Sequence, residues 1–507
     1  MSSHSRSFNS VRNIGVGAIK QIITLTLAFA TRTIFVRLLG AEYTGVNGLF
    51  NNILTVLSLA ELGVGNVLIY SLYAPLKAQD MGKVHGMLIY FKKIYTGIAL
   101  AVMVIGLAFV PFLKYIVNSL LPCNEIVTYY LLYLANSVMS YFAIYKTTLI
   151  QADQKVYIQN LVSTVVLVLQ YVLQIIYLLI SKNFIGYLVI QVACTLGQNL
   201  ILNYLANKMY PFLKESVTVD MSFDTSTIKN NIKSMFLYKM STVLINNTDN
   251  ICISIILGTI YVGYYSNYYS LITYVTTFVS LIITGITASL GNLNAEQDKD
   301  KSYRIFKNLI YMFNFITCFC VAAFTAVVQD FISIWVGKEY LLGIGTVVAL
   351  MIAFYIKNVV NPVWMYRETM GVFSQIKYIM VITAFLNIIF SIVLGYKYGI
   401  VGIVIATALS RLLTIFWYEP KLLYKNKFDK PVFEYFGMQC KYLVVNLILI
   451  LISVFVCNFL GGNFVFIAFK IVVCFTISML GHTLIFRNSE EYKWLQSKAM
   501  RVVRGKI

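Results

Sequence analysis

The sequence RLLGAEYTGVNGLFNNIL at residues 37–54 has a counterpart 218 positions later, IILGTIYVGYYSNYYSLI at residues 255–272. Both copies contain the pattern Leu-Gly-x-x-Tyr-x-Gly. The first glycine of each copy can end a helix in a left-handed conformation, and the second can let the following helix pass close to a neighbour. A repeat of this kind indicates a fold built from two related halves. The corresponding glycines are Gly40 and Gly45 in the first copy and Gly258 and Gly263 in the second.

The chain around this repeat is strongly apolar. Of its 507 residues, 59% are hydrophobic and 12% are charged, whereas an ordinary soluble domain has roughly 25% charged residues. Apolar stretches of about 20 residues or more, enough to cross a bilayer, recur along the whole chain. We therefore expect an all-α, polytopic integral membrane protein with about 14 transmembrane helices. The expected spans are 14–38, 44–72, 94–113, 126–148, 158–180, 184–206, 231–257, 262–290, 305–329, 341–365, 375–396, 399–420, 434–459 and 464–486.

The basic residues orient these spans. If the N-terminus is cytoplasmic, 28 of the 40 Lys and Arg residues fall on the cytoplasmic side, 5 fall on the opposite side and 7 lie within spans. This asymmetry follows the positive-inside rule, so we predict that both termini are cytoplasmic. The net charge of +20 is spread over many loops and forms no basic domain, which argues against nucleic-acid binding.

The repeat also predicts the domain organisation. Its offset pairs the first span with the seventh and the second with the eighth, so the two six-helix lobes would be related by an axis along the membrane normal. We expect the basic tail to form an amphipathic helix on an anionic leaflet or to be solvated. The predicted parts are an N-terminal lobe at 1–206, a cytoplasmic linker at 207–230, a C-terminal lobe at 231–423, helices 13 and 14 at 424–486 and a basic cytoplasmic tail at 487–507.

Two of the expected helices carry polar stripes inside the membrane. The stripe of the first span repeats every four residues and consists of Lys20, Thr24, Ala28 and Arg32. The seventh span carries a comparable face with Lys239, Thr242, Asn246 and Asn250. Intramembrane charges are costly and tend to face a cavity or a partner. We therefore predict that Lys20, Arg32, Lys239, Asn246 and Asn250 bind an anionic substrate such as a phosphate or pyrophosphate. For Lys20 and Lys239, extension to the cytoplasmic headgroups is an equal alternative.

Carboxylates at membrane depth suggest ion coupling. Asp249 lies beside Asn246 and Asn247, and oxygen-rich clusters of this type can hold Na⁺ or carry a proton. Pairing of Asp249 with a nearby Lys or Arg is the alternative. Glu61 is the comparable carboxylate of the first half, where it could instead hold a helix break. We expect structural or interfacial roles for the remaining intramembrane cations, Lys357, Arg411, Lys441 and Lys470.

Signatures of enzymes are weak. The sequence has neither a GxxxxGK[ST] loop nor an HExxH motif, and it has only three histidines. A DxD match at Asp298, Lys299 and Asp300 lies in a short basic loop, which we interpret as a run of solvated charges. The eight cysteines lie mostly in apolar runs without ligand spacing. We therefore predict no enzyme activity, no catalytic residue, no metal site and no resident cofactor.

Three stretches resemble the bacterial Wzx-type polysaccharide flippases of the multidrug/oligosaccharidyl-lipid/polysaccharide (MOP) superfamily. These are RSFNSVRNIGVGAIKQIITLTLAFATRTIFVRLLGAEYTGVNGLF at 6–50, LSLAELGVGNVLIYSLYAPL at 57–76 and YKYGIVGIVIATALSRLL at 396–413. The resemblance implies two lobes that alternate between inward-open and outward-open states in the bacterial inner membrane. It also implies transport of an undecaprenyl-pyrophosphate-linked oligosaccharide from the cytoplasmic to the outer leaflet, for O-antigen or capsule biosynthesis.

The resemblance further implies roles for particular residues. In the family, cations on the first helices of each lobe are thought to bind the pyrophosphate, and Lys20, Arg32 and Lys239 are the matching positions. Related lipid II flippases hold a cation between the seventh, eleventh and twelfth spans, where this chain has Asp249, Asn387 and Thr407. Because Asn387 and Thr407 stand where a second carboxylate would be expected, coupling to a Na⁺ or H⁺ gradient is left open.

Two other functions compete with a flippase. The first is an ion-coupled drug or metabolite antiporter of the same fold, which would need an acidic cavity for cationic substrates. The second is a non-transporting membrane component of a polysaccharide assembly complex, which would need larger outer loops than those predicted. The expected partners are the lipid-linked oligosaccharide, membrane lipids, and the polysaccharide polymerase with other assembly proteins. We expect the protein to be a monomer.

Overall fold

A computed structural model describes all residues except 1–2, 59–63, 214–224, 296–297, 371–372 and 504–507. Throughout the described ranges the chain forms helices joined by short connections, and these ranges contain no strand. In lipid, a helix satisfies its own backbone hydrogen bonds, whereas an open strand edge cannot. The expected all-α fold class is therefore confirmed.

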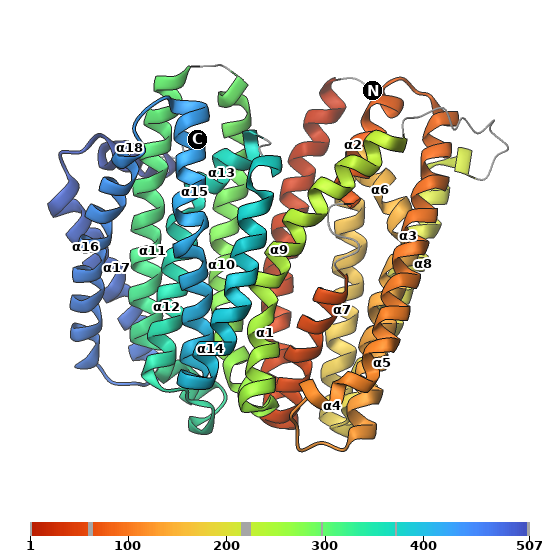
Figure 1. Cartoon of the computed structure of the whole chain (residues 1–507), viewed down its shortest axis with the longest axis horizontal. Helices are drawn as coiled ribbons and strands as arrows, with labels where there is room; N and C mark the ends of the chain where they lie inside the picture. The colour runs from red at the N-terminus through yellow and green to blue at the C-terminus, as the bar shows by residue number, and fades with distance from the viewer. Residues whose placement is uncertain (1–2, 59–63, 214–224, 296–297, 371–372, 504–507) are drawn as a thin grey trace. The chain divides into compact units, whose positions relative to one another are not determined.

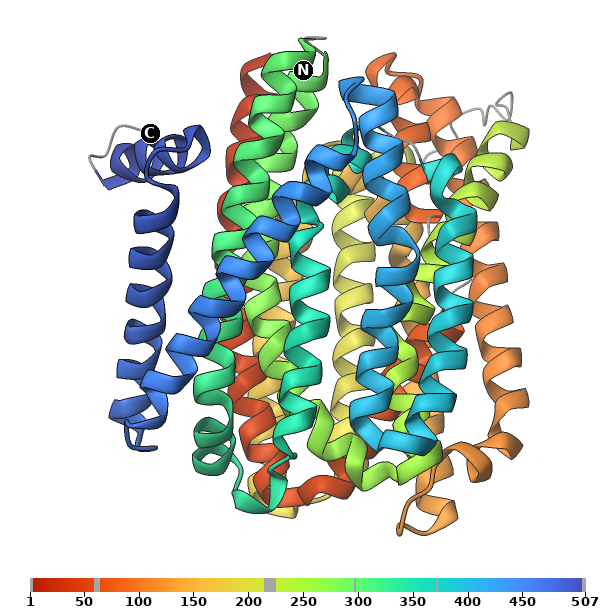
Figure 2. The same cartoon turned by 60° about the vertical axis from the view of Figure 1, so that its left-hand side comes forward.

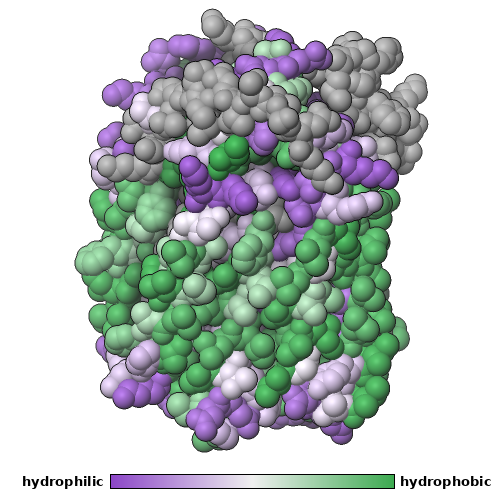
Figure 3. Space-filling view, turned by 90° about the vertical axis from the view of Figure 1, so that its right-hand side faces the viewer, coloured by the Kyte–Doolittle hydropathy of each residue, from purple (hydrophilic) through white to green (hydrophobic). Residues whose placement is uncertain are grey.

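The helices have the length and composition of membrane spans. Within the described residues, nine helices are long and apolar enough to cross a membrane, or up to eleven if each of two bent helix pairs is one span. On the face drawn in Figure 3, hydrophobic side chains form a broad band with hydrophilic side chains at both ends. The chain is thus a multi-pass membrane protein, while the count of 14 spans stays a prediction.

Packing divides the chain into two units, and the first is Met1–Gly263. Within it α1 packs on α7, α7 packs on α8, and α9 packs on both α1 and α2. We had assigned α9 to the C-terminal lobe, and the division into two six-helix lobes stays a prediction. The helices of unit 1 are α1 (Ser3–Leu57), α2 (Val64–Lys77), α3 (Met81–Phe109), α4 (Leu113–Ile116), α5 (Cys123–Ser140), α6 (Ile144–Ala152), α7 (Val156–Ser181), α8 (Phe184–Met209) and α9 (Thr225–Leu257) (Figure 1).

The second unit is Tyr264–Ile507. In it α16 and α17, drawn in blue in Figures 1 and 2, pack against α11 and each other. Helix α10 (Thr259–Ala295) begins at the end of unit 1 and continues in unit 2. The other helices of unit 2 are α11 (Lys299–Trp335), α12 (Ile344–Val359), α13 (Asn361–Met370), α14 (Phe373–Leu413), α15 (Ile415–Leu423), α16 (Phe433–Asn458), α17 (Phe464–Phe486) and α18 (Glu490–Val503).

The tail forms a helix that docks on unit 2. Helix α18 packs against α11, and its Trp494 and Leu495 contact the aromatic core cluster of the unit. Glu491 at the start of α18 forms an ion pair with Lys307 of α11 at 3.4 Å. The amphipathic alternative for the tail is therefore correct as to structure, and its apolar residues are partly covered by protein. Its contact with an anionic leaflet stays a prediction.

The repeat glycines behave as their sequence predicts. Gly40 interrupts α1 with a φ of 85°, and Gly258 separates α9 from α10 with a φ of 111°. Both angles lie in the region that side chains rarely adopt, so a glycine is needed at each break. Because each break follows the first helix of a repeat copy, the two copies turn at equivalent residues.

The second pair of repeat glycines forms a close helix crossing. A Cβ added to Gly45 would overlap the carbonyl oxygen of Thr259, and one added to Gly263 would overlap that of Ala41. The offset of 218 relates Ala41 to Thr259 and Gly45 to Gly263, so the two contacts are equivalent under exchange of the copies. This reciprocity is the signature of a local twofold axis through the crossing. The predicted close approach is confirmed.

Candidate functional site

The basic stripe of α1 lies in the half of the helix before Gly40. The Lys20 ammonium is half-buried and donates a hydrogen bond to Oδ1 of Asn160 in α7, at 3.2 Å. Arg32, three turns further along, is also half-buried and interacts electrostatically with Tyr187 of α8. Both cations are therefore held by polar groups inside unit 1. Lys20 has a partner there and does not depend on the lipid headgroups.

The polar face of α9 meets the other half of α1. The Asn250 amide, only 6% exposed, donates to the carbonyl oxygen of Gly48 at 3.4 Å. In the opposite direction, the Asn52 amide donates to the carbonyl oxygen of Asn247 at 3.2 Å. Interhelical amide hydrogen bonds of this kind hold membrane helices together. The structure thus places Asn250 in the interface between α1 and α9.

The other candidates on α9 surround this interface. The Asn246 amide is half-buried and donates to the carbonyl oxygen of Thr242 on its own helix, at 2.7 Å. Asp249 is buried, with 9% exposure, and Lys239 is half-buried two turns before Asn246. The carboxylate of Asp249 therefore lies in a membrane-depth environment, as its position in the sequence predicted.

The two ion-coupling candidates of unit 2 form a pair. Nδ2 of the fully buried Asn387 donates to Oγ1 of Thr407 at 2.9 Å. The two residues lie on opposite sides of a break in α14 at Gly399, so this hydrogen bond joins the two halves of the helix. Asp249 belongs to unit 1, and the three-residue set stays a prediction. Glu61 lies outside the described residues.

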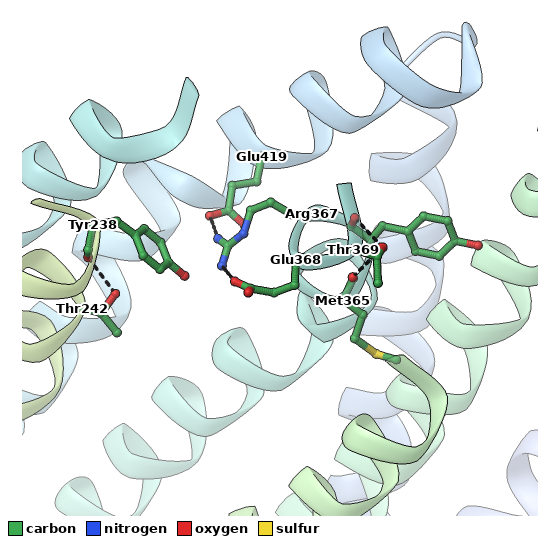
Figure 4. Close-up of polar contacts among 8 residues, drawn as sticks. Tyr238, Thr242, Met365, Arg367, Glu368, Thr369 and Glu419 are labelled. Atoms are coloured by element: carbon green, nitrogen blue, oxygen red, sulfur yellow. Dashed lines mark hydrogen bonds and ion pairs between the residues drawn. The ribbon is translucent and has the colours of Figure 1, made fainter. Parts of the chain in front are cut away.

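A buried charge cluster in unit 2 was missed by the sequence analysis. Arg367 of α13 and Glu419 of α15 are 5% and 6% exposed, and Nη1 of Arg367 lies 2.5 Å from Oε1 of Glu419. Nη2 of the same guanidinium pairs with Glu368 at 3.1 Å (Figure 4). We had counted Arg367 as a charge at a span edge, whereas it is buried. The partners are 52 residues apart and share no local pattern, so the sequence gives no signal for the pair.

The remaining intramembrane cations of unit 2 have varied surroundings. Lys470 pairs with Asp330 at 2.6 Å, and the Lys441 ammonium lies 5.1 Å from the ring centre of Phe486. Lys357 is exposed on α12. The contacts of Lys470 and Lys441 agree with the structural roles expected for them.

A buried polar network joins α16 and α17 to α11. Oδ1 of Asn446 lies 3.1 Å from Nε2 of His482, and the amide of Asn446 donates to the carbonyl oxygen of Asn314 at 3.3 Å. The other imidazole nitrogen of His482 lies 3.3 Å from the Tyr311 hydroxyl. Each of these four residues is at most 1% exposed. Such a network fixes the register of the last two spans against the rest of the unit.

Comparisons with known proteins identify the fold. No family model matches the chain, and no curated protein sequence matches it. A lipid II flippase, MurJ, in an inward closed conformation is similar with a TM-score of 0.65 and 13% identity, over 93% of this chain and 98% of that one. An inward-facing multidrug resistance transporter of the MATE family and MOP superfamily has a TM-score of 0.63 and 14% identity, over 80% of this chain and 98% of that one.

A third similar structure is a MOP superfamily transporter from Pyrococcus furiosus, for which a binding pocket of reverse polarity is described. It has a TM-score of 0.55 and 14% identity, over 83% of this chain and 96% of that one. At identities of 13% and 14%, these similarities report on the backbone arrangement. The chain has the fold of the MOP superfamily transporters.

Proposed function

We propose that this protein is a flippase that moves an undecaprenyl-pyrophosphate-linked oligosaccharide repeat unit across the membrane by alternating access. The observation that carries the proposal is the pair of half-buried cations on α1, Lys20 and Arg32, held by polar groups at membrane depth. A cation in a low-dielectric environment attracts a phosphate strongly, because little solvent screens the interaction. With Lys239 of α9, these residues would bind the pyrophosphate, and Asn246 and Asn250 would add amide contacts.

The extent of the structural similarity supports a lipid-linked cargo. The MurJ structure covers 93% of this chain, whereas the MATE structure covers 80%. The difference of 13% of 507 residues is about 66 residues, comparable in length to the region of α16 and α17 at 433–486. A lipid-linked substrate needs a place for its polyprenyl tail, and these two added helices would provide an apolar surface for it.

Direction and location follow from the charge distribution. With both termini in the cytoplasm of a bacterial cell, the repeat unit would enter from the cytoplasmic leaflet and leave to the outer leaflet, for O-antigen or capsule biosynthesis. The protein would act as a monomer, without enzyme activity of its own. Its product would pass to a polysaccharide polymerase and other assembly proteins.

Removal of the α1 cation is expected to block transport. In a flippase-null strain, Arg32→Ala should lower surface polysaccharide at least about tenfold, because the loss of one charge-assisted contact to phosphate costs about 1.5–3 kcal/mol and 1.4 kcal/mol corresponds to tenfold. Lys239→Ala should have a similar effect. The measurement is surface polysaccharide per cell, normalised to the amount of flippase in the membrane.

Arg37→Ala is the matched control for Arg32→Ala. Arg37 lies on the same helix and is exposed, so the control removes the same charge from outside the proposed site and should restore polysaccharide fully. If Arg32→Ala and Lys239→Ala both restore polysaccharide as well as Arg37→Ala does, the cations do not bind the cargo.

Ion coupling is tested at Asp249. If Asp249, Asn387 and Thr407 hold Na⁺ or a proton, Asp249→Asn removes the negative charge while keeping the shape of the side chain, and transport should lose its dependence on the ion gradient. Transport of a labelled lipid-linked oligosaccharide is measured in proteoliposomes with imposed Na⁺ or pH gradients. A variant that responds to the gradients as the unsubstituted protein does excludes Asp249 from coupling.

The MATE similarity favours one second candidate, an ion-coupled drug or metabolite antiporter. Such a protein would export cations and would need an acidic cavity, whereas the intramembrane stripes of α1 and α9 contain three cations and one carboxylate. Expression in a drug-sensitive strain separates the two functions. Raised resistance to cationic drugs, together with failure to restore surface polysaccharide, would favour the antiporter.

A further inference from the structure

A groove on unit 1 has not been used by the proposed function. Helices α3 and α8 both pack on the bent segment formed by α5, the short 3₁₀ helix Tyr141–Ala143 and α6. The axes of α5 and α6 differ by 43° at this bend. The bend leaves a hollow of about 410 Å³ between α3 and α8, which we call the α3–α8 groove. Its lining includes Lys92 and Thr96 of α3, Phe142 at the bend, and Leu200 and Asn203 of α8.

One end of the groove is polar and positively charged. Lys92 lines it and is exposed. The Lys146 ammonium donates hydrogen bonds to Asn203, a lining residue, and to Asn207 at 2.7 Å. None of the described residues that line the groove is acidic. Two ammonium groups without a carboxylate in the same wall favour an anion.

The remainder of the groove is apolar and continues into the lipid-facing surface. Phe142 and Leu200 at its rim are 63% and 68% exposed. On α3 the exposed side chains beyond Thr96 are all hydrophobic up to the end of the helix and include Leu100, Val104 and Leu107. On the face drawn in Figure 3, hydrophilic side chains extend from one end into the hydrophobic band. A ligand that fits this surface has an anionic head and one or more hydrocarbon chains.

The position along the membrane normal identifies the source of such a ligand. Lys92 and Lys93 immediately precede the expected span at 94–113, and the charge distribution puts this end of α3 on the cytoplasmic side. Cytoplasmic leaflets contain anionic lipids, and basic pockets between transmembrane helices on that side bind their headgroups. Tyr95, Tyr141 and Tyr145, which also line the groove, belong to the residue type enriched at this depth.

We infer that the α3–α8 groove is a binding site for an anionic bilayer phospholipid, whose phosphate contacts Lys92 and whose acyl chains lie along α3 and α8. The site goes beyond the proposed function and does not rest on it, because it needs only the lipids of the surrounding leaflet. A lipid bound across the bend would bridge α3 and α8. It would thereby stabilise the bend that the helices leave open.

The test measures lipid retention by the purified full-length chain. The protein in detergent is incubated with phosphatidylglycerol or with phosphatidylcholine of the same acyl chains, and bound lipid is counted by native mass spectrometry. We expect selective retention of phosphatidylglycerol, and we expect Lys92→Ala to weaken it about fivefold. Lys93→Ala is the matched control, because Lys93 is the exposed neighbour outside the groove and its loss changes the net charge equally.

A second variant tests the cavity independently of charge. Thr96→Trp would fill the groove from an exposed position on α3 and should abolish selective retention while the protein still elutes as a folded species in size-exclusion chromatography. Equal retention of the two lipids, equal losses in Lys92→Ala and Lys93→Ala, or full retention in Thr96→Trp would each overturn the inference. The first two outcomes would indicate annular lipid held by diffuse surface charge.

Discussion

Replacing Arg367 with methionine is expected to lower the free energy of unfolding of the protein by about 3–5 kcal/mol, the usual cost of removing one partner from a buried ion pair. Glu419 is 6% exposed, so without the guanidinium its carboxylate stays buried with its main counter-charge lost. The measurement is equilibrium unfolding in mixed micelles with increasing mole fraction of a denaturing detergent.

Two controls separate charge burial from packing. The double variant Arg367→Met with Glu419→Leu should recover most of the lost stability, because replacing both charges of a buried pair by apolar groups is often close to neutral. Lys299→Met removes one partner of an exposed pair, in which the Lys299 and Asp429 side chains are 60% and 81% exposed. That change should cost less than about 1 kcal/mol. Equal losses in Arg367→Met and Lys299→Met would mean that burial of the Arg367 pair adds nothing.

Substitutions at the helix crossing should be as severe. Gly45→Val is expected to cost more than about 3 kcal/mol, because the new side chain would overlap the carbonyl oxygen of Thr259 and the two backbones would have to separate. Gly263→Val should cost a similar amount, because it makes the equivalent contact with Ala41. The measurement is the amount of folded protein after extraction, from fluorescence-detected size-exclusion chromatography of a tagged chain.

Gly97→Val is the matched control for the crossing. Gly97 lies in α3, and a Cβ added there would meet nothing within 4 Å. The substitution also replaces glycine by a better helix former, so it should leave the amount of folded protein unchanged. If Gly45→Val and Gly263→Val gave as much folded protein as Gly97→Val, the close crossing of the repeat copies would not exist.

Prediction from sequence succeeded where the signal is local. The fold class follows from apolar runs long enough to cross a bilayer, because hydropathy depends only on neighbours in the chain. The breaks at Gly40 and Gly258 follow from the conformational freedom of glycine, which also needs no tertiary context. The internal repeat added a long-range element, because two copies of one pattern fold alike and meet through equivalent residues. For this reason even the approach of Gly45 to the backbone near Gly263 could be anticipated.

Prediction was weaker for the candidate site. The polar stripe of α1 was visible as a four-residue period, but its partner Asn160 on α7 was not, because the sequence does not encode which apolar helix packs on which. Asn250 was predicted to bind substrate on the basis of its face of α9, whereas the structure places it against Gly48 of α1. A polar side chain inside a membrane helix marks a contact to be satisfied. The sequence alone does not reveal whether helix or cargo satisfies it.

The sequence by itself determined that this protein is all-helical, spans the membrane several times and contains two copies of one glycine pattern. Only the tertiary structure decided that Arg367 meets Glu419, that Asn446 meets His482, and that the bend at Tyr141–Ala143 opens a groove beside Lys92. The physical reason is that hydropathy and backbone preference act along the chain. Pairing, in contrast, depends on distances between helices, and the apolar faces of those helices are nearly interchangeable in sequence.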